Sequence, residues 1–267
     1  MPELPEVEVT RLRLVPELVG RRFEKVDIRV AKLRVPVAPD LSSLVEGRKL
    51  RAIERRGKYL LFDCESGWLL IHLGMTGFLQ LLPRMAPPGK HDHLDFHFDD
   101  GQLLRFHDPR KFGTVLWLTG NPSCHPLLAS IGPEPLSDGF NGTILHAVGR
   151  ARRVAIKQLI MDSQVVAGVG NIYANEALFV AGISPERVSA TLTVPEYELL
   201  AEAIRSVLGF SVERGSSYRV MEDTAAYFPL DNRVYGRGGK PCLRCGGTLH
   251  ETRLGNRSTV FCRSCQC

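Results

Sequence analysis

The sequence has little of what would place a protein in a specialised class. Aromatic residues make up only 7% of its 267 residues, and 34 Lys and Arg against 29 Asp and Glu give a formal net charge of only +5. Hydrophobic residues make up 44%, which is ordinary for a globular chain and argues against intrinsic disorder. Neither an internal repeat nor a low-complexity tract is visible. The small basic excess permits a polyanionic partner without requiring one.

Signals for export or membrane insertion are also missing. The first six residues contain two prolines and two glutamates and do not resemble a signal peptide. The longest uncharged stretch, residues 66–83, is long enough for a membrane span, but glycine, histidine and proline interrupt it. It is better explained as two strands around a glycine-rich turn at residues 72–77. We therefore expect a soluble, cytoplasmic protein that has no membrane partner.

The seven cysteines indicate a metal site rather than a disulfide framework. Three are scattered, and the other four form two Cys-x2-Cys pairs with sixteen residues between the pairs: Cys242, Cys245, Cys262 and Cys265. Each pair places two thiolates on one tight turn, and a closed set of four leaves no coordination position for water. The spacing predicts one structural zinc ion, and the alternative is four unligated, reduced thiols.

The hydrophobic pattern changes twice along the rest of the chain. Residues 3–19 have helical periodicity, and short apolar runs with strand character follow, including an alternating hairpin pattern over residues 93–106. A proline-rich stretch, residues 119–141, then precedes a helical region. We expect an α+β multidomain protein with an N-terminal β-sandwich and leading helix over residues 1–130, a helical domain over 131–232 and a zinc ribbon over 233–267.

The helical region carries two further local signals. Residues 167–170 form a glycine-containing connection ahead of a helix, where backbone N–H groups can hold a phosphate. Tight packing of two helices explains these glycines equally well. Thr193 and Glu196 form a capping box at the start of a later helix, and Gly215 is the expected end of that helix.

The predicted ribbon is strongly basic. Residues 233–267 contain seven Lys or Arg and one Glu, a local charge of +6 that exceeds the net charge of the whole chain. Basic zinc ribbons most often contact phosphates, which favours a nucleic-acid partner. The alternative is a solvated charged surface around a metal that only stabilises the tail.

The N-terminus offers a nucleophile. If Met1 is removed, Pro2 carries a terminal secondary amine, and α-amines have a pKa of roughly 7.7–8.0 in model peptides. A useful fraction is then neutral at physiological pH and able to attack a sugar C1′ or an aldehyde, which gives an iminium intermediate. Glu3 and Glu6 share one face of the first helical turn, where one of them could move protons. Alternatively, proline and glutamate are present because both are favoured in a first helical turn.

Single residues in the strand-rich part are weaker signals. Lys58 follows two arginines and a glycine, and His91 lies beside an aspartate. The turn at residues 108–112 carries two cations and an aromatic side chain. Met75 and Phe112 are expected to pack in a core or a turn, but an apolar side chain beside basic groups can also wedge between stacked bases.

Five segments of the chain form a collinear pattern: Pro2–Glu8, His72–Met75, Asp108–Gly113, Gly168–Glu176 and Cys262–Gln266. The pattern resembles the formamidopyrimidine-DNA glycosylase family and runs from residue 2 to residue 266. The motifs are long, which makes the resemblance specific. The first two segments favour this branch of the family over the branch that resembles endonuclease VIII.

The resemblance implies a fold and a set of catalytic roles. The fold is a helix-bearing β-sandwich, a helix–two-turn–helix domain and a zinc ribbon around a DNA groove. Pro2 would be the Schiff-base nucleophile, Glu3 would donate and accept protons, and Glu6 would support that network. Lys58 would assist β-elimination and hold a phosphate, and Arg263 would bind phosphate and assist δ-elimination.

The resemblance also implies DNA-binding residues. The positions that match the family's DNA contacts are Lys58, His72, His91, Arg110, Arg153, Lys157, Asn171, Tyr235 and Arg263. Met75, Arg110 and Phe112 match the three residues that fill the gap left when a nucleotide is extruded from the duplex. Extrusion is needed because the glycosidic carbon cannot be reached inside a stacked duplex.

The implied activity is that of a bifunctional DNA glycosylase and AP lyase of base excision repair. It would excise oxidised purines, 8-oxoguanine and formamidopyrimidines, through a Schiff base on Pro2 and then nick the strand by β,δ-elimination. The implied partner is damaged double-stranded DNA, bound by a monomer with one zinc ion and no small-molecule cofactor. The alternatives are an endonuclease VIII-like glycosylase for oxidised pyrimidines and a non-catalytic protein that binds damaged DNA.

One departure from the family pattern concerns the lesion. The family's lesion-recognition loop usually carries glycines, whereas residues 216–235 contain none and the loop is shorter. The chemistry implied for Pro2 is unaffected by this difference. A preference for oxidised guanine over ring-opened purines or other oxidised bases does not follow from the sequence.

Overall fold

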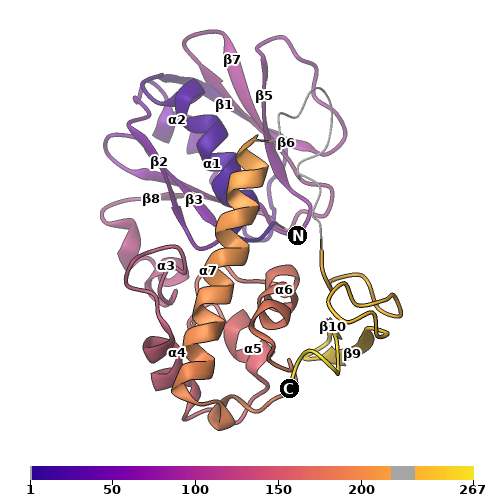
Figure 1. Ribbon diagram of the computed structural model, residues 1–267. Helices are drawn as coiled ribbons and strands as arrows, with labels where there is room; N and C mark the ends of the chain where they lie inside the picture. The colour runs from indigo at the N-terminus through magenta and orange to yellow at the C-terminus, as the bar shows by residue number, and fades with distance from the viewer. Residues whose placement is uncertain (1, 218–231) are drawn as a thin grey trace. The chain divides into compact units, whose positions relative to one another are not determined.

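The computed structural model describes residues 2–217 and 232–267. The described residues fall into two compact units (Figure 1). Unit 1 contains residues 2–129 and 215–217, and unit 2 contains residues 130–214 and 232–267. Neither described stretch contains a helix that combines the length and the apolar character needed to cross a membrane.

Unit 1 is the predicted β-sandwich. One sheet has the strand order β1-β6-β7-β5 and the other β2-β3-β4-β8, and neighbouring strands are antiparallel. Its elements are α1 (Leu4–Leu18), β1 (Phe23–Ile28), α2 (Leu41–Val45), β2 (Ala52–Arg56), β3 (Tyr59–Asp63), β4 (Trp68–His72), β5 (Phe78–Pro83), β6 (Asp92–Phe98), β7 (Gln102–His107), β8 (Thr114–Leu118), η1 (Pro122–Cys124) and α3 (Pro126–Ala129).

The core of unit 1 is built from side chains of both sheets and of α1. Phe96 and Phe106 of one sheet share a fully buried hydrophobic cluster with Phe62 of the other sheet and Leu18 of α1. Removal of these large apolar surfaces from water drives the two sheets together. The rigid sandwich that results is the scaffold from which its connecting loops project.

The glycine-rich turn predicted within residues 66–83 is confirmed, and it has a particular place in the sandwich. β4 pairs with β3 and β8, whereas β5 pairs with β7. The two strands on either side of the turn therefore belong to different sheets. The turn carries the chain across from one layer to the other.

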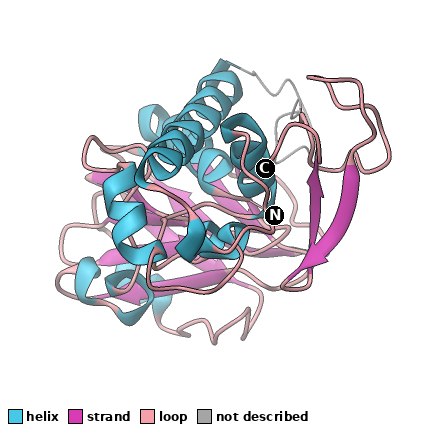
Figure 2. Cartoon of the chain, turned by 60° about the horizontal axis from the view of Figure 1, so that its bottom comes forward, coloured by secondary structure: helices cyan, strands magenta, loops and turns pink. Residues whose placement is uncertain are grey.

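Unit 2 consists of helices followed by a two-stranded ribbon. Figure 2, coloured by element type, shows that the strands of the described residues lie in the sandwich and in this C-terminal hairpin. The elements are α4 (Gly142–Gly149), α5 (Ile156–Met161), α6 (Asn171–Ala181), η2 (Ser189–Thr191), α7 (Val194–Ser217, whose last three residues belong to unit 1), β9 (His250–Leu254) and β10 (Arg257–Phe261).

The helix α7 begins where the sequence predicts and ends later. The backbone N–H of Thr193 donates to Glu196 Oε2 at 2.7 Å, which is the glutamate half of the predicted capping box. The predicted end at Gly215 is wrong, because the helix continues to Ser217. A glycine ends a helix when it takes a left-handed conformation, as Gly182 does after α6 with φ of 72°. Gly215 is not among the described residues with positive φ, so it continues the helix.

Candidate active site and nucleic-acid interface

The first turn of α1 brings three of the predicted catalytic residues together. Glu3 is the N-cap, and its backbone N–H donates to Glu6 Oε2 at 2.8 Å as one half of a reciprocal capping box. Glu3 is only 1% exposed and Glu6 5%, and Pro2, directly before them, is buried as well. Carboxylates are stabilised at this end of a helix by the macrodipole. The turn therefore buries two acidic groups in the helical turn that directly follows Pro2.

The turn between β2 and β3 presents Lys58, and α1 holds that turn in place. Arg55 Nε donates to Glu8 Oε2 at 2.8 Å, and the same guanidinium donates through Nη1 to the carbonyl of Gly57 at 3.1 Å. Gly57 has φ of 55°, which a side chain would disfavour. Burial favours the neutral form of Glu8, but hydrogen bonds from Arg11 and Arg55 hold its pKa below the ordinary value. The carboxylate is therefore charged at neutral pH and maintains its ion pair with Arg55.

His72, the last residue of β4, is a neutral hydrogen-bond donor. Its ring lies 4.8 Å from that of Tyr59, its partner across the β3–β4 pair. Burial, with the positive charges of Lys58 and Arg34, lowers the pKa of His72 to about 4, although Asp108 acts in the opposite direction. The backbone N–H of Gly74 donates to Nδ1 at 3.0 Å, so the ring proton is on Nε2. His72 can thus donate to a phosphate without taking up a proton.

Two loops of the sandwich are joined through the buried side chain of Asp108. Thr76 Oγ1 donates to Asp108 Oδ1 at 3.0 Å, and the backbone N–H of Gly113 donates to Asp108 Oδ2 at 2.8 Å. Gly74 has φ of 70°, and a Cβ there would lie only 2.5 Å from the backbone carbon of Phe112. The turn at residues 73–77 and the loop at 108–113 therefore form one rigid pair. Nothing in the sequence pattern predicts that Asp108 and Thr76 hold them together.

This pair of loops carries the three residues predicted to fill a gap in a duplex. Phe112 is 42% exposed, so it does not pack in the core, and the Arg110 guanidinium carbon lies 4.7 Å from its ring centroid. Met75 is half-buried on the neighbouring turn. His91, also half-buried, is joined to the same loop because its carbonyl accepts the N–H of Asp108 at 3.0 Å.

The remaining predicted contacts are in unit 2. Asn171 is the first residue of α6, whose N-cap is Gly170, and a helix N-terminus favours a bound phosphate. Arg153 is exposed ahead of α5 and has no ion pair among the described residues. Tyr235 is half-buried, and its backbone N–H donates to Glu176 Oε1 at 2.8 Å.

Two polar residues of α6 that the sequence did not single out hold the ribbon and the segment before it. Glu176 is 5% exposed, and its carboxylate accepts the backbone N–H groups of Arg233, Val234 and Tyr235 at 2.8, 2.9 and 2.8 Å. Asn175 Oδ1 accepts the N–H of Val260 in β10 at 2.9 Å. The available signal was a polar pair in the middle of a largely apolar helix.

Lys157 differs from the other predicted DNA contacts because it is 1% exposed. Its ammonium donates to the carbonyl of Ser258 at 2.8 Å and to Thr259 Oγ1 at 2.7 Å. Both acceptors belong to β10, so Lys157 links α5 to the ribbon. A direct contact with DNA would require the ribbon to move away from this ammonium, and we propose the linking role for it instead.

The four predicted zinc ligands converge at the end of unit 2. Their sulfur atoms all lie within 4.8 Å of one another, with Cys245 and Cys262 at 3.5 Å and Cys242 and Cys265 at 4.0 Å. A tetrahedral zinc site with Zn–S bonds of about 2.3 Å has S···S separations of about 3.8 Å. The donor set therefore fits one zinc ion with all four positions filled by the protein.

Arg263 projects from this zinc site. It follows Cys262 directly, is exposed, and donates through Nη2 to His250 Nε2 at 3.0 Å. Gln266 fixes the same knuckle, since its Oε1 accepts the N–H of Cys262 at 3.0 Å and its Nε2 donates to the carbonyl of Ile183 at 2.9 Å. The expected lesion loop at residues 216–235 lies largely outside the described residues.

Three family models match the chain. Residues 1–115 match the model described as "Formamidopyrimidine-DNA glycosylase N-terminal domain". Residues 131–222 match "Formamidopyrimidine-DNA glycosylase H2TH domain", and residues 239–266 match "Zinc finger found in FPG and IleRS". Most of the chain is therefore matched, in the order that the sequence motifs predict.

Individual relatives agree with the family models. The formamidopyrimidine-DNA glycosylase of Geobacter metallireducens is 62% identical over 266 residues, which cover 100% of both chains. The chain also resembles Lactococcus lactis Fpg (MutM) non-covalently bound to AP-site DNA, with a TM-score of 0.88 and 32% identity over 99% of each chain. The same Lactococcus protein with N7-benzyl-Fapy-dG DNA gives a TM-score of 0.90 at 32% identity, again over 99% of each chain.

Proposed function

This chain belongs to the formamidopyrimidine-DNA glycosylase family, and we propose that it is a bifunctional DNA glycosylase and AP lyase that removes oxidised purines from damaged double-stranded DNA. The single observation that carries the proposal is the first turn of α1, where Pro2 directly precedes the buried carboxylates of Glu3 and Glu6. The Lactococcus relative supports the substrate class, because it binds DNA with an AP site or a ring-opened purine.

In the proposed reaction, the Pro2 nitrogen attacks C1′ of the damaged nucleotide, the N-glycosidic bond breaks, and the base leaves with a proton. The sugar ring then opens, O4′ takes up a proton, and an iminium links Pro2 to C1′. Glu3 lies directly after Pro2 and is the group that transfers these protons, while Glu6 fixes the backbone of Glu3. Burial of both carboxylates keeps bulk water from competing with them.

Strand cleavage follows from the same intermediate. The iminium makes the C2′ proton acidic, and its loss expels the 3′ phosphate by β-elimination. A second elimination expels the 5′ phosphate. Lys58 assists the first step from its turn beside α1, which the ion pair of Arg55 with Glu8 secures. Arg263 binds phosphate and assists the second step.

The nucleotide must leave the base stack before Pro2 can reach its sugar, at a cost of a few kcal/mol. Met75 and Phe112 replace part of the lost stacking, and Arg110 hydrogen-bonds the orphaned base on the opposite strand. The exposed Phe112 on a loop braced by Asp108 suits this task, because the wedge is rigid before DNA arrives. Pre-organisation of this kind lowers the entropy lost on binding.

The proposed contacts with DNA come from both units. The proposed donors are Lys58, His72, His91, Arg110, Arg153, Asn171, Tyr235 and Arg263. We assign residues 1–130 to the catalytic domain, 131–232 to the helix–two-turn–helix domain with its lesion loop, and 233–267 to the zinc ribbon. The protein acts as a monomer in the bacterial cytoplasm, where its DNA substrate lies.

The test is borohydride trapping on duplexes that contain 8-oxoguanine, ring-opened guanine or thymine glycol. Borohydride reduces the iminium to a stable amine, so a covalent protein–DNA adduct is expected with both oxidised purines. A form that retains Met1 should give none, and Pro2→Gly should trap far less, whereas Pro88→Gly in an exposed loop should trap normally.

Two results would contradict the proposal. If trapping survives both the retained Met1 and Pro2→Gly, the nucleophile is a different amine. If the lesion duplexes are bound but never nicked, the protein is a non-catalytic binder. Faster nicking of thymine glycol than of either purine would instead assign it to oxidised pyrimidines.

A further inference from the structure

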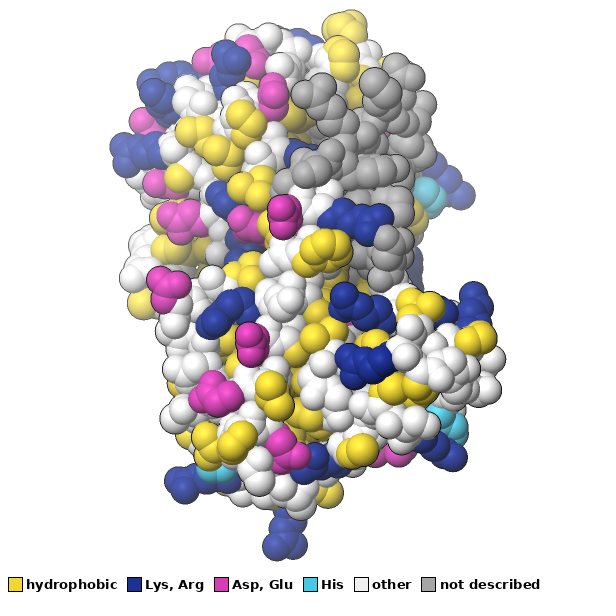
Figure 3. Space-filling view, viewed as in Figure 1, with side chains coloured by type: hydrophobic (Ala, Val, Ile, Leu, Met, Phe, Trp, Pro, Cys, Tyr) yellow, Lys and Arg dark blue, Asp and Glu magenta, His cyan; other side chains and the backbone are white. Residues whose placement is uncertain are grey.

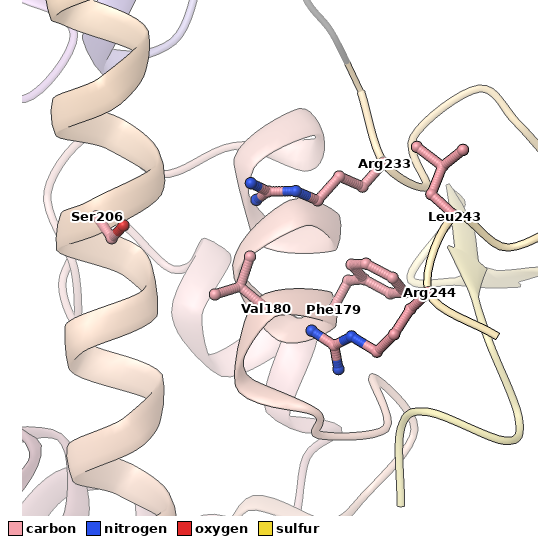
Figure 4. Close-up of a pocket in the computed structure, with 6 residues that line it drawn as sticks. All are labelled: Phe179, Val180, Ser206, Arg233, Leu243 and Arg244. Atoms are coloured by element: carbon pink, nitrogen blue, oxygen red, sulfur yellow. The ribbon is translucent and has the colours of Figure 1, made fainter.

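A pocket in unit 2 lies between α6, α7 and the ribbon. Its volume is about 390 Å³, and the described residues that line it are Phe179, Val180, Ser206, Arg233, Leu243 and Arg244. Figure 4 shows both arginine side chains extending from the ribbon side towards α6 and α7. None of these residues has a role in the chemistry proposed for Pro2.

The two arginines of this pocket have no acidic partner among residues 2–217 and 232–267. Among the described residues, neither guanidinium forms an ion pair. The Arg244 guanidinium carbon lies 4.7 Å from the ring centroid of the buried Phe179, a cation–π contact that orients it. The backbone of Arg233 is held by Glu176. Arg244 is therefore oriented through its guanidinium and Arg233 through its backbone, and both side chains line one pocket where an anionic ligand can reach them.

Apolar side chains surround these charges. Leu243 is 68% exposed at the pocket, and Phe210 is 59% exposed on α7. Phe210 follows Ser206 by four residues, so the two share one face of the helix. Exposed apolar residues that cluster beside a pocket are typical of a binding surface rather than of an ordinary exterior. Figure 3 shows hydrophobic and basic side chains next to one another on this face.

We propose that this pocket binds an acidic peptide segment of a partner protein. Its carboxylates pair with Arg233 and Arg244, since guanidinium groups bind carboxylates through two parallel hydrogen bonds. An apolar side chain between those carboxylates packs on Val180 and Leu243, towards Phe210. A protein partner of this kind would bring the enzyme to other factors without occupying its DNA-binding residues.

A nucleic-acid phosphate fits the same pocket less well. It would use the two guanidinium groups but would leave the apolar side chains exposed to water. Asn171, the proposed phosphate contact of α6, lies at the other end of that helix, eight residues from Phe179. At 1.5 Å per residue the two positions are about 12 Å apart along the axis. The pocket is thus removed from that contact.

The experiment measures binding of fluorescein-labelled pentapeptides to the full, zinc-loaded chain by fluorescence anisotropy. The probe is Asp-Asp-Phe-Asp-Asp, and the controls are Asp-Asp-Ala-Asp-Asp and Asn-Asn-Phe-Asn-Asn. We expect both controls to bind at least tenfold more weakly, because each lacks one of the two features. Arg233→Gln, Arg244→Gln and Leu243→Ser should each weaken the probe at least fivefold. Arg253→Gln, the same charge change at an exposed ribbon position outside the pocket, should change binding less than twofold.

The anisotropy measurements and their controls distinguish an acidic-peptide site from the alternatives. Zinc content is measured for every variant, and Arg233→Gln lies outside the ligand pairs, so metal loss cannot explain its effect. A probe no tighter than the two controls, or equal losses for Arg253→Gln and Arg244→Gln, would overturn the proposal. So would displacement of the probe by undamaged duplex DNA, which would identify a phosphate site. Failure here leaves the trapping test of Pro2 untouched, because that test does not depend on this pocket.

Discussion

Glu176→Gln is the sharpest perturbation of the network that holds the ribbon. The native carboxylate is buried and accepts three consecutive backbone N–H groups, from Arg233, Val234 and Tyr235. Hydrogen bonds to charged groups contribute about 1.5–3 kcal/mol each. An amide in the same place keeps one neutral oxygen for Val234 and Tyr235 but turns an NH₂ group towards the N–H of Arg233. We expect a loss of about 2 kcal/mol in the stability of unit 2.

The loss should appear in unit 2 alone. Val234 is fully buried in a small cluster with the ligands Cys242 and Cys262, so a weakened anchor loosens the zinc site. Both tryptophans of the chain, Trp68 and Trp117, belong to unit 1. Tryptophan fluorescence therefore reports on unit 1, and zinc release into a chromogenic chelator reports on the ribbon.

The assay is a urea titration followed by both probes. For Glu176→Gln, zinc release should shift to lower urea by about 1 M, given a slope of about 2 kcal/mol per M, while the fluorescence midpoint stays where it is. Glu202→Gln, an exposed glutamate on α7, is the matched control and should shift neither. Unchanged zinc release in Glu176→Gln would refute the reasoning. Equal shifts of both probes would also refute it, because the effect would then be global.

Three further changes test other parts of the structure. Phe112→Ala should slow base excision about tenfold in single-turnover kinetics and change stability by less than about 0.5 kcal/mol, because this side chain is exposed; a lower melting temperature with unaltered excision would contradict its role. The hydrogen bond from Arg187 lowers the pKa of Glu196 from 4.5 to about 2. Its stabilisation is therefore present above about pH 4.5 and lost between there and pH 2, so Glu196→Gln should cost about 1 kcal/mol at pH 7 and flatten the pH dependence of unfolding in that interval. Cys262→Ser should lose zinc, measured by atomic absorption, and weaken DNA binding while tryptophan fluorescence is unchanged.

Features set by neighbouring residues were predictable from the sequence. The contact of Thr193 with Glu196 and the first turn of α1 each join positions three apart, and the two Cys-x2-Cys pairs are equally local. The alternating hairpin over residues 93–106 also appeared as predicted, in β6 and β7. Each of these signals lies within one short stretch of the chain, where side-chain pattern determines backbone conformation.

Features that depend on distant partners were not predictable. Gly215 looked like a helix end, but its conformation depends on the structure around it rather than on its lack of a side chain. Lys157 was predicted to contact DNA, and only the position of Ser258, a hundred and one residues later, shows that its ammonium is held inside the protein. The carboxylate of Glu176 reaches backbone groups nearly sixty residues away. No periodicity in the sequence carries that information.

The zinc site and the buried polar residues of α5 and α6 stabilise the ribbon in different ways. Zinc closes a small module whose own hydrophobic cluster is limited to a few side chains, so the metal determines how the ribbon folds. The metal binds only cysteines of the ribbon, so it does not determine how the ribbon sits on α5 and α6. Apolar packing does not determine this either, because it is non-directional. Lys157, Asn175 and Glu176 supply that direction through hydrogen bonds to the backbone of β10 and of residues 233–235. The orientation of Arg263 and Tyr235, two of the proposed DNA contacts, therefore depends on α5 and α6 as much as on the metal.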